Sequence, residues 1–145
     1  MNELFAVDNV SYRYHDTVPA LDRVSVSVQD GEIFAFIGAN GSGKSTLLQV
    51  MGGLLHPSEG TVSFTGREVS ERTLHEKEFM QFFRSRVGYV FQDSDVQLFC
   101  PTVFEDVAFG PRQMGESPEV VRLRVEEALK RVGLVGFETR SPQHL

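Results

Sequence analysis

The sequence has no tryptophan, one cysteine and three lysines, and its acidic residues outnumber its basic ones. Cys100 has no second cysteine to pair with, so an internal disulfide is excluded, which fits a reducing cytoplasm. The 20 Asp and Glu residues against 14 Lys and Arg residues give a net charge of −6. Nucleic-acid-binding proteins usually carry a basic excess, so this balance disfavours a nucleic-acid partner.

Long hydrophobic runs are also missing. The longest is Ile-Phe-Ala-Phe-Ile at residues 33–37, whereas a membrane-spanning helix needs about 20 apolar residues. The N-terminus has neither a basic start nor a long apolar stretch, so no signal peptide is expected. Hydrophobic residues still make up 41% of the 145-residue chain, and Phe occurs 12 times. This composition is typical of a globular protein with a packed core.

Hydrophobic patterning predicts mainly strands, together with two helices, up to residue 92. Residues 24–28 alternate strictly between apolar and polar, as in a half-buried strand. Residues 33–37 are apolar on both faces, which predicts the buried central strand of a parallel sheet. Further strands are expected at 4–14, 61–65 and 87–91, and helices at 45–51, where Gly52-Gly53 end the helix, and at 71–84.

From residue 93 onward the sequence predicts helices instead. Thr102 and Glu105 form a capping box, and Ser117-Pro118 is a second helix start. Gly133 is expected to end that second helix. We therefore expect a part at residues 1–92 and a mainly helical part at residues 93–145. An apolar stripe on the second helix is expected at Val121, Val125, Ala128 and Val132.

A glycine-rich loop follows residues 33–37 and matches the phosphate-binding pattern G-x-x-x-x-G-K-[ST] in full. Glycine lets the backbone fold around an anion with its N–H groups pointing inward. The helix that begins there adds the positive end of its dipole. The pattern predicts a nucleotide-phosphate site formed by Gly38, Ala39, Asn40, Gly41, Ser42, Gly43, Lys44, Ser45 and Thr46.

Within this loop, three side chains have distinct expected roles. Lys44 should reach the β- and γ-phosphates of ATP as a point charge, and Ser45 should offer its hydroxyl to Mg²⁺. Thr46 should lie in the first turn of the helix, near the α-phosphate. The alternative is a glycine-rich turn whose lysine is merely solvated, and the strand and helix patterns on either side disfavour it.

The loop alone indicates a nucleotide but not a function. No Asn-Lys-x-Asp occurs, which disfavours a guanine-specific GTPase. The same residues also fit G-x-x-G-x-G-K-[ST], a form found in small-molecule kinases, so a P-loop kinase is an alternative function. Arg122, Arg124 and Arg131 could supply the arginine lid of such a kinase, although they are more typical of a solvated helix face.

The wider pattern resembles the ATP-binding cassette (ABC) family, the motor subunits of ABC transporters, and most of all the cobalt-type and energy-coupling-factor importers. The resemblance covers the whole chain, and residues 93–111 are its most subfamily-specific part. It implies an α/β fold with a P-loop sheet core, an antiparallel β subdomain and the start of a helical subdomain. The segments that carry it are 10–14, 21–26, 31–32, 87–92, 93–99 and 101–111.

The resemblance also implies two further site residues. Tyr14 matches the aromatic residue that stacks on adenine, with Tyr12 as the alternative, and stacking of a base on a ring contributes about 1–3 kcal/mol. Gln92 matches the Q-loop glutamine, a contact of Mg²⁺ and of the attacking water and a relay to the membrane subunit. ATP and Mg²⁺ are the implied cofactors.

The resemblance ends with residues 141–145, Ser-Pro-Gln-His-Leu. Family members continue here into the signature loop Leu-Ser-Gly-Gly-Gln, of which only Leu145 has a counterpart. The Walker B strand, the catalytic Glu and the switch His have none. We therefore expect the front portion of an ABC subunit, which binds nucleotide weakly by itself and does not hydrolyse it. One flank of its sheet is expected to be uncovered.

For the intact subunit, the resemblance implies a cytoplasmic protein that is bound to the inner face of the cell membrane. Its expected partners are a transmembrane transporter subunit and a second ATP-binding subunit, identical or different. The imported solute would be a metal ion such as cobalt or nickel, or a vitamin. A soluble ABC protein without a transport role and a non-hydrolysing ATP-binding module are the remaining alternatives.

Overall fold

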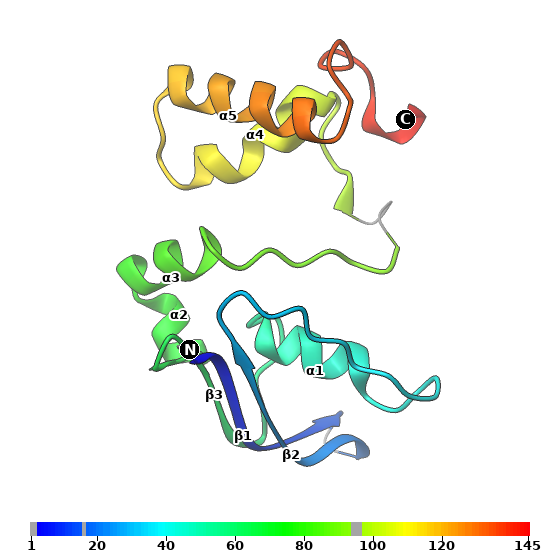
Figure 1. Cartoon of the computed structure of the whole chain (residues 1–145), viewed down its shortest axis with the longest axis vertical. Helices are drawn as coiled ribbons and strands as arrows, with labels where there is room; N and C mark the ends of the chain where they lie inside the picture. The colour runs from blue at the N-terminus through cyan, green and yellow to red at the C-terminus, as the bar shows by residue number, and fades with distance from the viewer. Residues whose placement is uncertain (1–2, 16, 94–96) are drawn as a thin grey trace. The chain divides into compact units, whose positions relative to one another are not determined.

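The computed structural model describes residues 3–15, 17–93 and 97–145. The chain divides into two compact units, Met1–Tyr89 and Val90–Leu145. Figure 1 shows strands and helices in the first unit and helices in the second. None of the helices among the described residues has the length and hydrophobicity of a membrane span.

An antiparallel sheet forms the base of the first unit. Its strands are β1 (Glu3–Tyr14), β2 (Val18–Gln29), β3 (Glu59–Phe64) and β4 (Arg67–Glu68). They lie in the order β2-β1-β3-β4, and each neighbouring pair runs antiparallel. The strands expected at 4–14, 24–28 and 61–65 are confirmed, because alternating apolar residues place one face of each strand against a core.

Two facing bulges interrupt the long β1–β2 pair. Asn9 and Arg23 both adopt left-handed backbone conformations, with φ of 49° at each residue. The backbone N–H of Asn9 donates to Ser25 Oγ at 2.9 Å, and that of Arg23 donates to Ser11 Oγ at 3.1 Å. The two serines thus satisfy N–H groups that the bulges remove from the ladder. The bulges separate the last residues of β1, including Tyr14, from the regularly paired first part of the strand.

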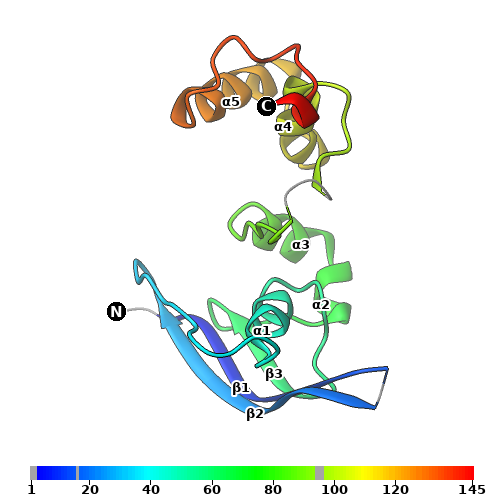
Figure 2. The same ribbon diagram turned by 90° about the vertical axis from the view of Figure 1, so that its right-hand side faces the viewer.

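Three helices cover one face of this sheet (Figure 2). They are α1 (Lys44–Met51), α2 (Glu71–His75) and α3 (Lys77–Arg84). At the centre of the core, Phe64 and Phe83 pack edge to face. Their ring centroids lie 5.4 Å apart, and the interplanar angle is 86°. The buried core consists of Val7, Val10, Leu21, Leu47, Val50, Met51, Val62, Phe64, Val69, Phe79 and Phe83.

The strand expected at 33–37, as the centre of a parallel sheet, and the strand expected at 87–91 are both absent from the structure, so these two expectations were wrong. Neither segment belongs to the sheet that the described residues form. Ile33 is 100% exposed, Ile37 95% and Val90 85%. An apolar run favours burial on both faces, but it forms a parallel strand only beside neighbouring strands with helices above and below. The antiparallel sheet offers these residues neither neighbouring parallel strands nor a layer of helices on each face.

The expectation of a single helix at 71–84 was also wrong. The structure has two helices here, α2 and α3, separated at Glu76. Glu76 has an extended backbone, with φ −75° and ψ 111°, and its carboxylate pairs with Arg67. Ser70 caps the first of the two helices by accepting a hydrogen bond from the N–H of Thr73. The sequence signals for helix composition were correct, but they did not locate the break.

Arg84 links the end of α3 to the end of α1. Its guanidinium donates to the carbonyl oxygen of Gly52 at 3.1 Å and to that of Gly53 at 3.4 Å. Gly53 follows α1 in the left-handed conformation, with φ of 64°, so the predicted end of this helix is confirmed. The guanidinium therefore satisfies carbonyl groups that a helix end leaves without intrahelical donors.

We expect Arg84→Met to lower the free energy of unfolding by about 1.5–3 kcal/mol, because the charge-assisted hydrogen bond to Gly52 and the longer one to Gly53 are lost while the aliphatic stem is kept. Urea unfolding of the variant and the wild type measures this difference. Arg72→Met is the matched control, since Arg72 is an exposed arginine of α2. Equal losses in the two variants would contradict a specific role for Arg84.

The second unit is built on two helices, α4 (Val103–Gln113) and α5 (Pro118–Arg131), with a short 3-10 turn at Pro142–His144. Both predicted helix starts are confirmed. Thr102 Oγ1 accepts from the N–H of Glu105 at 3.2 Å, and Ser117 Oγ accepts from that of Val120 at 3.4 Å. The buried core of this unit is Val103, Ala108, Val121, Val125 and Leu129.

The apolar stripe of α5 differs at its end from the expected one. Val121 and Val125 are buried as predicted and Ala128 is half-buried, but Leu129 completes the buried set and Val132 is 67% exposed. Steps of four residues keep Val121, Val125 and Leu129 on one helix face. Val132 is the C-cap, where the chain leaves the helix, so its side chain no longer follows the stripe.

Candidate nucleotide-phosphate site

The predicted phosphate loop is irregular backbone that leads directly into α1. The N–H of Ser42 donates to the carbonyl oxygen of Ala39 at 3.3 Å and closes a turn. Gly41 and Gly43 have φ of 79° and 88°, conformations that glycine adopts without a steric penalty. The helix expected at 45–51 begins one residue earlier, at Lys44.

Gly43 holds the loop close to β2. A Cβ at this position would lie 2.4 Å from the carbonyl oxygen of Ala20 and 3.0 Å from a methyl carbon of Leu21. At Gly41, by contrast, a Cβ would meet nothing within 4 Å. Both glycines supply left-handed backbone, but only Gly43 is also required by a close approach to another strand.

We expect Gly43→Ala to lower the free energy of unfolding by at least about 2 kcal/mol more than Gly41→Ala. Both variants carry the left-handed penalty of about 1–2 kcal/mol, and the Gly43 variant alone adds a collision with a backbone carbonyl. Chemical denaturation of both variants measures the difference. Similar losses for the two would show that the loop can move away from β2 at little cost.

The N-terminus of α1 is open to an anion. Its N-cap is Gly43, no side chain caps its first turn, and that turn contains no acidic residue. The starts of α2, α4 and α5 are instead capped by a serine or threonine hydroxyl. The first N–H groups of a helix have no intrahelical acceptors, so those of α1 are available to phosphate oxygens.

Lys44 folds back over the loop. Its ammonium donates to the carbonyl oxygens of Gly38 at 3.0 Å and Ala39 at 2.7 Å. A cavity of about 320 Å³ borders this loop and is lined by Phe36, Ile37, Gly38, Ser42, Gly43, Lys44 and apolar residues of β2 and α1. A phosphate bound here would therefore share the ammonium with these carbonyls or displace them.

The donor set suits Mg²⁺ only together with a nucleotide. Among the described residues there is no group of three or more His, Cys, Asp and Glu side chains that could hold a metal ion by themselves. Ser45, in the first turn of α1, has an exposed side chain with one hydroxyl oxygen to offer. Mg²⁺ characteristically takes few protein ligands and completes its shell with phosphate oxygens and water. The residues present fit that arrangement.

The structure brings Tyr14 to the phosphate loop. Its hydroxyl shares a hydrogen bond of 3.1 Å with the hydroxyl of Thr46 in the first turn of α1. The ring of Tyr12 lies 5.0 Å away at an interplanar angle of 84°. Tyr14 is 37% exposed, whereas Tyr12 packs against the core. Sequence reasoning missed the Tyr14–Thr46 contact, because no local pattern joins residues 32 positions apart.

Gln92 is an exposed residue of the second unit.

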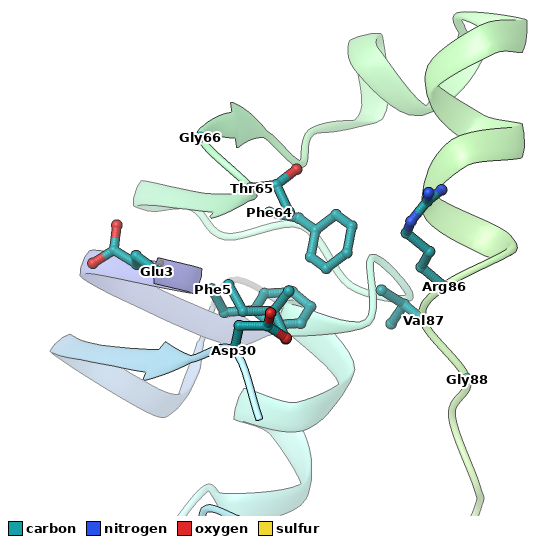
Figure 3. A pocket seen from close by; sticks show the side chains of 10 residues that line it. Glu3, Phe5, Asp30, Phe64, Thr65, Gly66, Arg86, Val87 and Gly88 are labelled. Carbon is teal, nitrogen blue, oxygen red and sulfur yellow. The ribbon is translucent and has the colours of Figure 1, made fainter. Parts of the chain in front are cut away.

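The first unit also has a larger cavity, of about 970 Å³ (Figure 3). Phe5, Phe64 and Val87 form its apolar wall, and Asp30 and Arg86 lie among the polar residues that line it. None of the residues of the predicted nucleotide-phosphate site lines it. The chemistry of the loop, not the size of a cavity, therefore identifies the candidate site.

Comparison with known proteins decides the family. The profile of the family described as "ABC transporter" matches residues 21–145. The chain belongs to the ABC transporter family. This membership confirms the resemblance seen in the sequence and sets aside the small-molecule kinase.

Relatives carry names from the same family. The chain is 43% identical to "Energy-coupling factor transporter ATP-binding protein EcfA2" of Methanospirillum hungatei JF-1 over 100% of its own length and 35% of the relative's. It is 46% identical to "Energy-coupling factor transporter ATP-binding protein EcfA" of Methanothermobacter thermautotrophicus over 94% of its own length and 43% of the relative's. The chain thus spans about half or less of the length of these relatives.

Solved structures show the same fold. CbiO1 of Clostridium perfringens, described as part of the ABC transporter complex CbiONQ, matches with a TM-score of 0.77 and 36% identity over 99% of this chain and 55% of that one. The ABC transporter cassette MJ0796, described as dimeric, matches with a TM-score of 0.81 and 29% identity over 98% of this chain and 63% of that one. The α/β P-loop fold of an ABC ATPase is confirmed, in incomplete form.

Proposed function

We propose that this chain forms the ATP-binding part of the motor subunit of an ABC importer. The observation that carries the proposal is the complete phosphate loop, folded at the uncapped N-terminus of α1 with Lys44 over it. The names of the energy-coupling-factor relatives and the likeness to CbiO1 support an importer of that type. The solute would be cobalt, nickel or a vitamin.

Each candidate residue has a role in this proposal. The N–H groups of residues 38–46 and the ammonium of Lys44 hold the phosphates of ATP. Ser45 and Gln92 are the protein ligands of Mg²⁺, which neutralises charge on the phosphates when it is bound. Tyr14 stacks on the adenine. Residues 1–92 form the nucleotide-binding core with its β subdomain, and residues 93–145 form part of the helical subdomain.

Hydrolysis requires groups that the 145 residues do not supply. A water that attacks the γ-phosphate needs a positioned base, and the resemblance assigns none of the chain's carboxylates to that role. We propose that the 145-residue chain binds ATP without turnover. The natural protein would hydrolyse ATP as a dimer, on the cytoplasmic face of the membrane, beside a transmembrane subunit.

Two measurements test this function. Titration with a fluorescent ATP analogue should show saturable, Mg²⁺-dependent binding to the 145-residue chain, and phosphate release by this chain should stay at background. Turnover by the 145-residue chain that is lost in Lys44→Ala would overturn the second expectation. Failure of the natural-length protein to bind ATP would overturn the function as a whole.

Purification from membranes separates a transporter subunit from a soluble ABC protein. We expect the tagged natural-length protein to copurify, in mild detergent, with a hydrophobic membrane subunit. Recovery of ribosomes or DNA in place of such a subunit would instead favour the soluble, non-transport alternative. Uptake of labelled cobalt, nickel or vitamins by cells that express the complex would then identify the solute.

A further inference from the structure

One hydrogen bond joins the two halves of the proposed nucleotide site. Tyr14, at the end of β1, and Thr46, in α1, lie 32 positions apart in sequence, and their hydroxyl oxygens are 3.1 Å apart. Thr46 is 7% exposed, so its hydroxyl has little access to water. A hydroxyl buried in this way is costly without a partner, and in this structure the partner is the phenol of Tyr14.

The surroundings of the bond restrict both residues. Thr46 is the third residue of α1, and its neighbours Leu47 and Val50 are buried in the core. Tyr14 follows the paired bulges of β1 and β2, and the ring of Tyr12 stands almost perpendicular to its own. The helix is therefore fixed by the core, whereas the end of β1 pairs with β2 at Tyr14 and Val18 and contacts the helix through this hydrogen bond.

We infer that the Tyr14 hydroxyl is a positioning group, which sets the distance between the adenine platform and the phosphate loop. The inference rests on the proposed function, because it concerns the same nucleotide site. A ring alone suffices for stacking, since every aromatic face can carry a base. The hydroxyl, through Thr46, ties that ring to the helix whose N–H groups face the phosphates.

A ligand that contacts both halves should depend on this hydrogen bond, and a ligand that contacts one half should not. ATP carries a base and phosphates in one molecule, whereas inorganic tripolyphosphate has phosphates alone. Loss of the hydroxyl frees the ring to move, so part of the binding energy of ATP is spent on ordering it again. Tripolyphosphate carries no base and avoids that cost.

The test compares both ligands on the natural-length protein by isothermal titration calorimetry in Mg²⁺ buffer. We expect Tyr14→Phe to weaken ATP binding about fivefold, the effect of one lost hydrogen bond, and to leave tripolyphosphate binding unchanged. Tyr12→Phe is the matched control, since it removes a phenol hydroxyl from the same strand. It should leave both affinities unchanged.

Substitutions at Thr46 complete the test. Thr46→Val should weaken ATP binding, Thr46→Ser should restore it, and Tyr14→Phe should have little further effect in the Thr46→Val background, because residues that share one interaction are not additive. Equal ATP affinity of Tyr14→Phe and wild type, or equal weakening of both ligands, would overturn the inference. If the wild type binds neither ligand, the proposed function fails instead.

Discussion

Lys44→Ala should reduce the affinity for ATP about 100-fold, since one or two charge-assisted hydrogen bonds to phosphate are each worth about 1.5–3 kcal/mol. The wild-type ammonium already lies at the loop, 2.7 Å from the carbonyl oxygen of Ala39. It needs only to exchange or share these carbonyls to reach a bound phosphate. Alanine leaves the backbone N–H groups in place but removes the only lysine of the loop.

The small number of lysines makes the control simple. Lys130 lies in the last turn of α5, in the other unit. Lys130→Ala removes the same charge from the chain, so it should leave the dissociation constant for ATP unchanged. Equilibrium dialysis with labelled ATP measures both variants. Comparable losses would mean that net charge, not contact with the loop, controls affinity.

Phe83→Ala should lower the free energy of unfolding by about 3–5 kcal/mol, the usual cost of removing a large aromatic side chain from a core. The ring of Phe83 is 0% exposed and lies between two others, with centroids 5.4 Å from Phe64 and 6.0 Å from Phe79. These rings join the sheet to α3, so the cavity would open at the centre of the first unit. Domains have only about 5–15 kcal/mol to lose, so the unit would be barely stable.

Met80 provides the matched control on the same helix, because its side chain is 37% exposed. Met80→Ala should cost less than about 1 kcal/mol, as partly solvated side chains do. Urea titration followed by far-ultraviolet circular dichroism measures both variants. If the two losses were equal, the aromatic cluster would not be the centre of stability that its burial indicates.

Local sequence signals predicted the features that local interactions control. Alternation identified β2 and β3, β-branched and aromatic content identified β1, and capping residues identified the starts of α4 and α5. The phosphate-loop pattern located the start of α1 to within one residue. In each case the signal is a pattern of residue types within a few positions along the chain, so the sequence displays it directly.

The features that were mispredicted or missed depend on distant partners. Residues 33–37 have the composition of a buried strand, but strands form only beside other strands. The break at Glu76 accompanies an ion pair with Arg67, nine positions away. The tight fit of Gly43 against Ala20 and the Tyr14–Thr46 hydrogen bond both join separate elements. No periodicity or motif encodes such pairs.

Residues 33–37, of which only Phe36 packs against the core, have a further consequence for the chain in solution. Short segments of high β-propensity that lack charge and proline are the ones that stack into cross-β fibrils. Here one phenylalanine and one isoleucine stand on each side of an alanine, and Ile33 and Ile37 are almost fully solvated. Glu32 is the nearest charge, and its carboxylate accepts a hydrogen bond from the backbone N–H of Gln29. Residues 33–37 therefore combine the composition of a cross-β segment with exposed isoleucines at both ends.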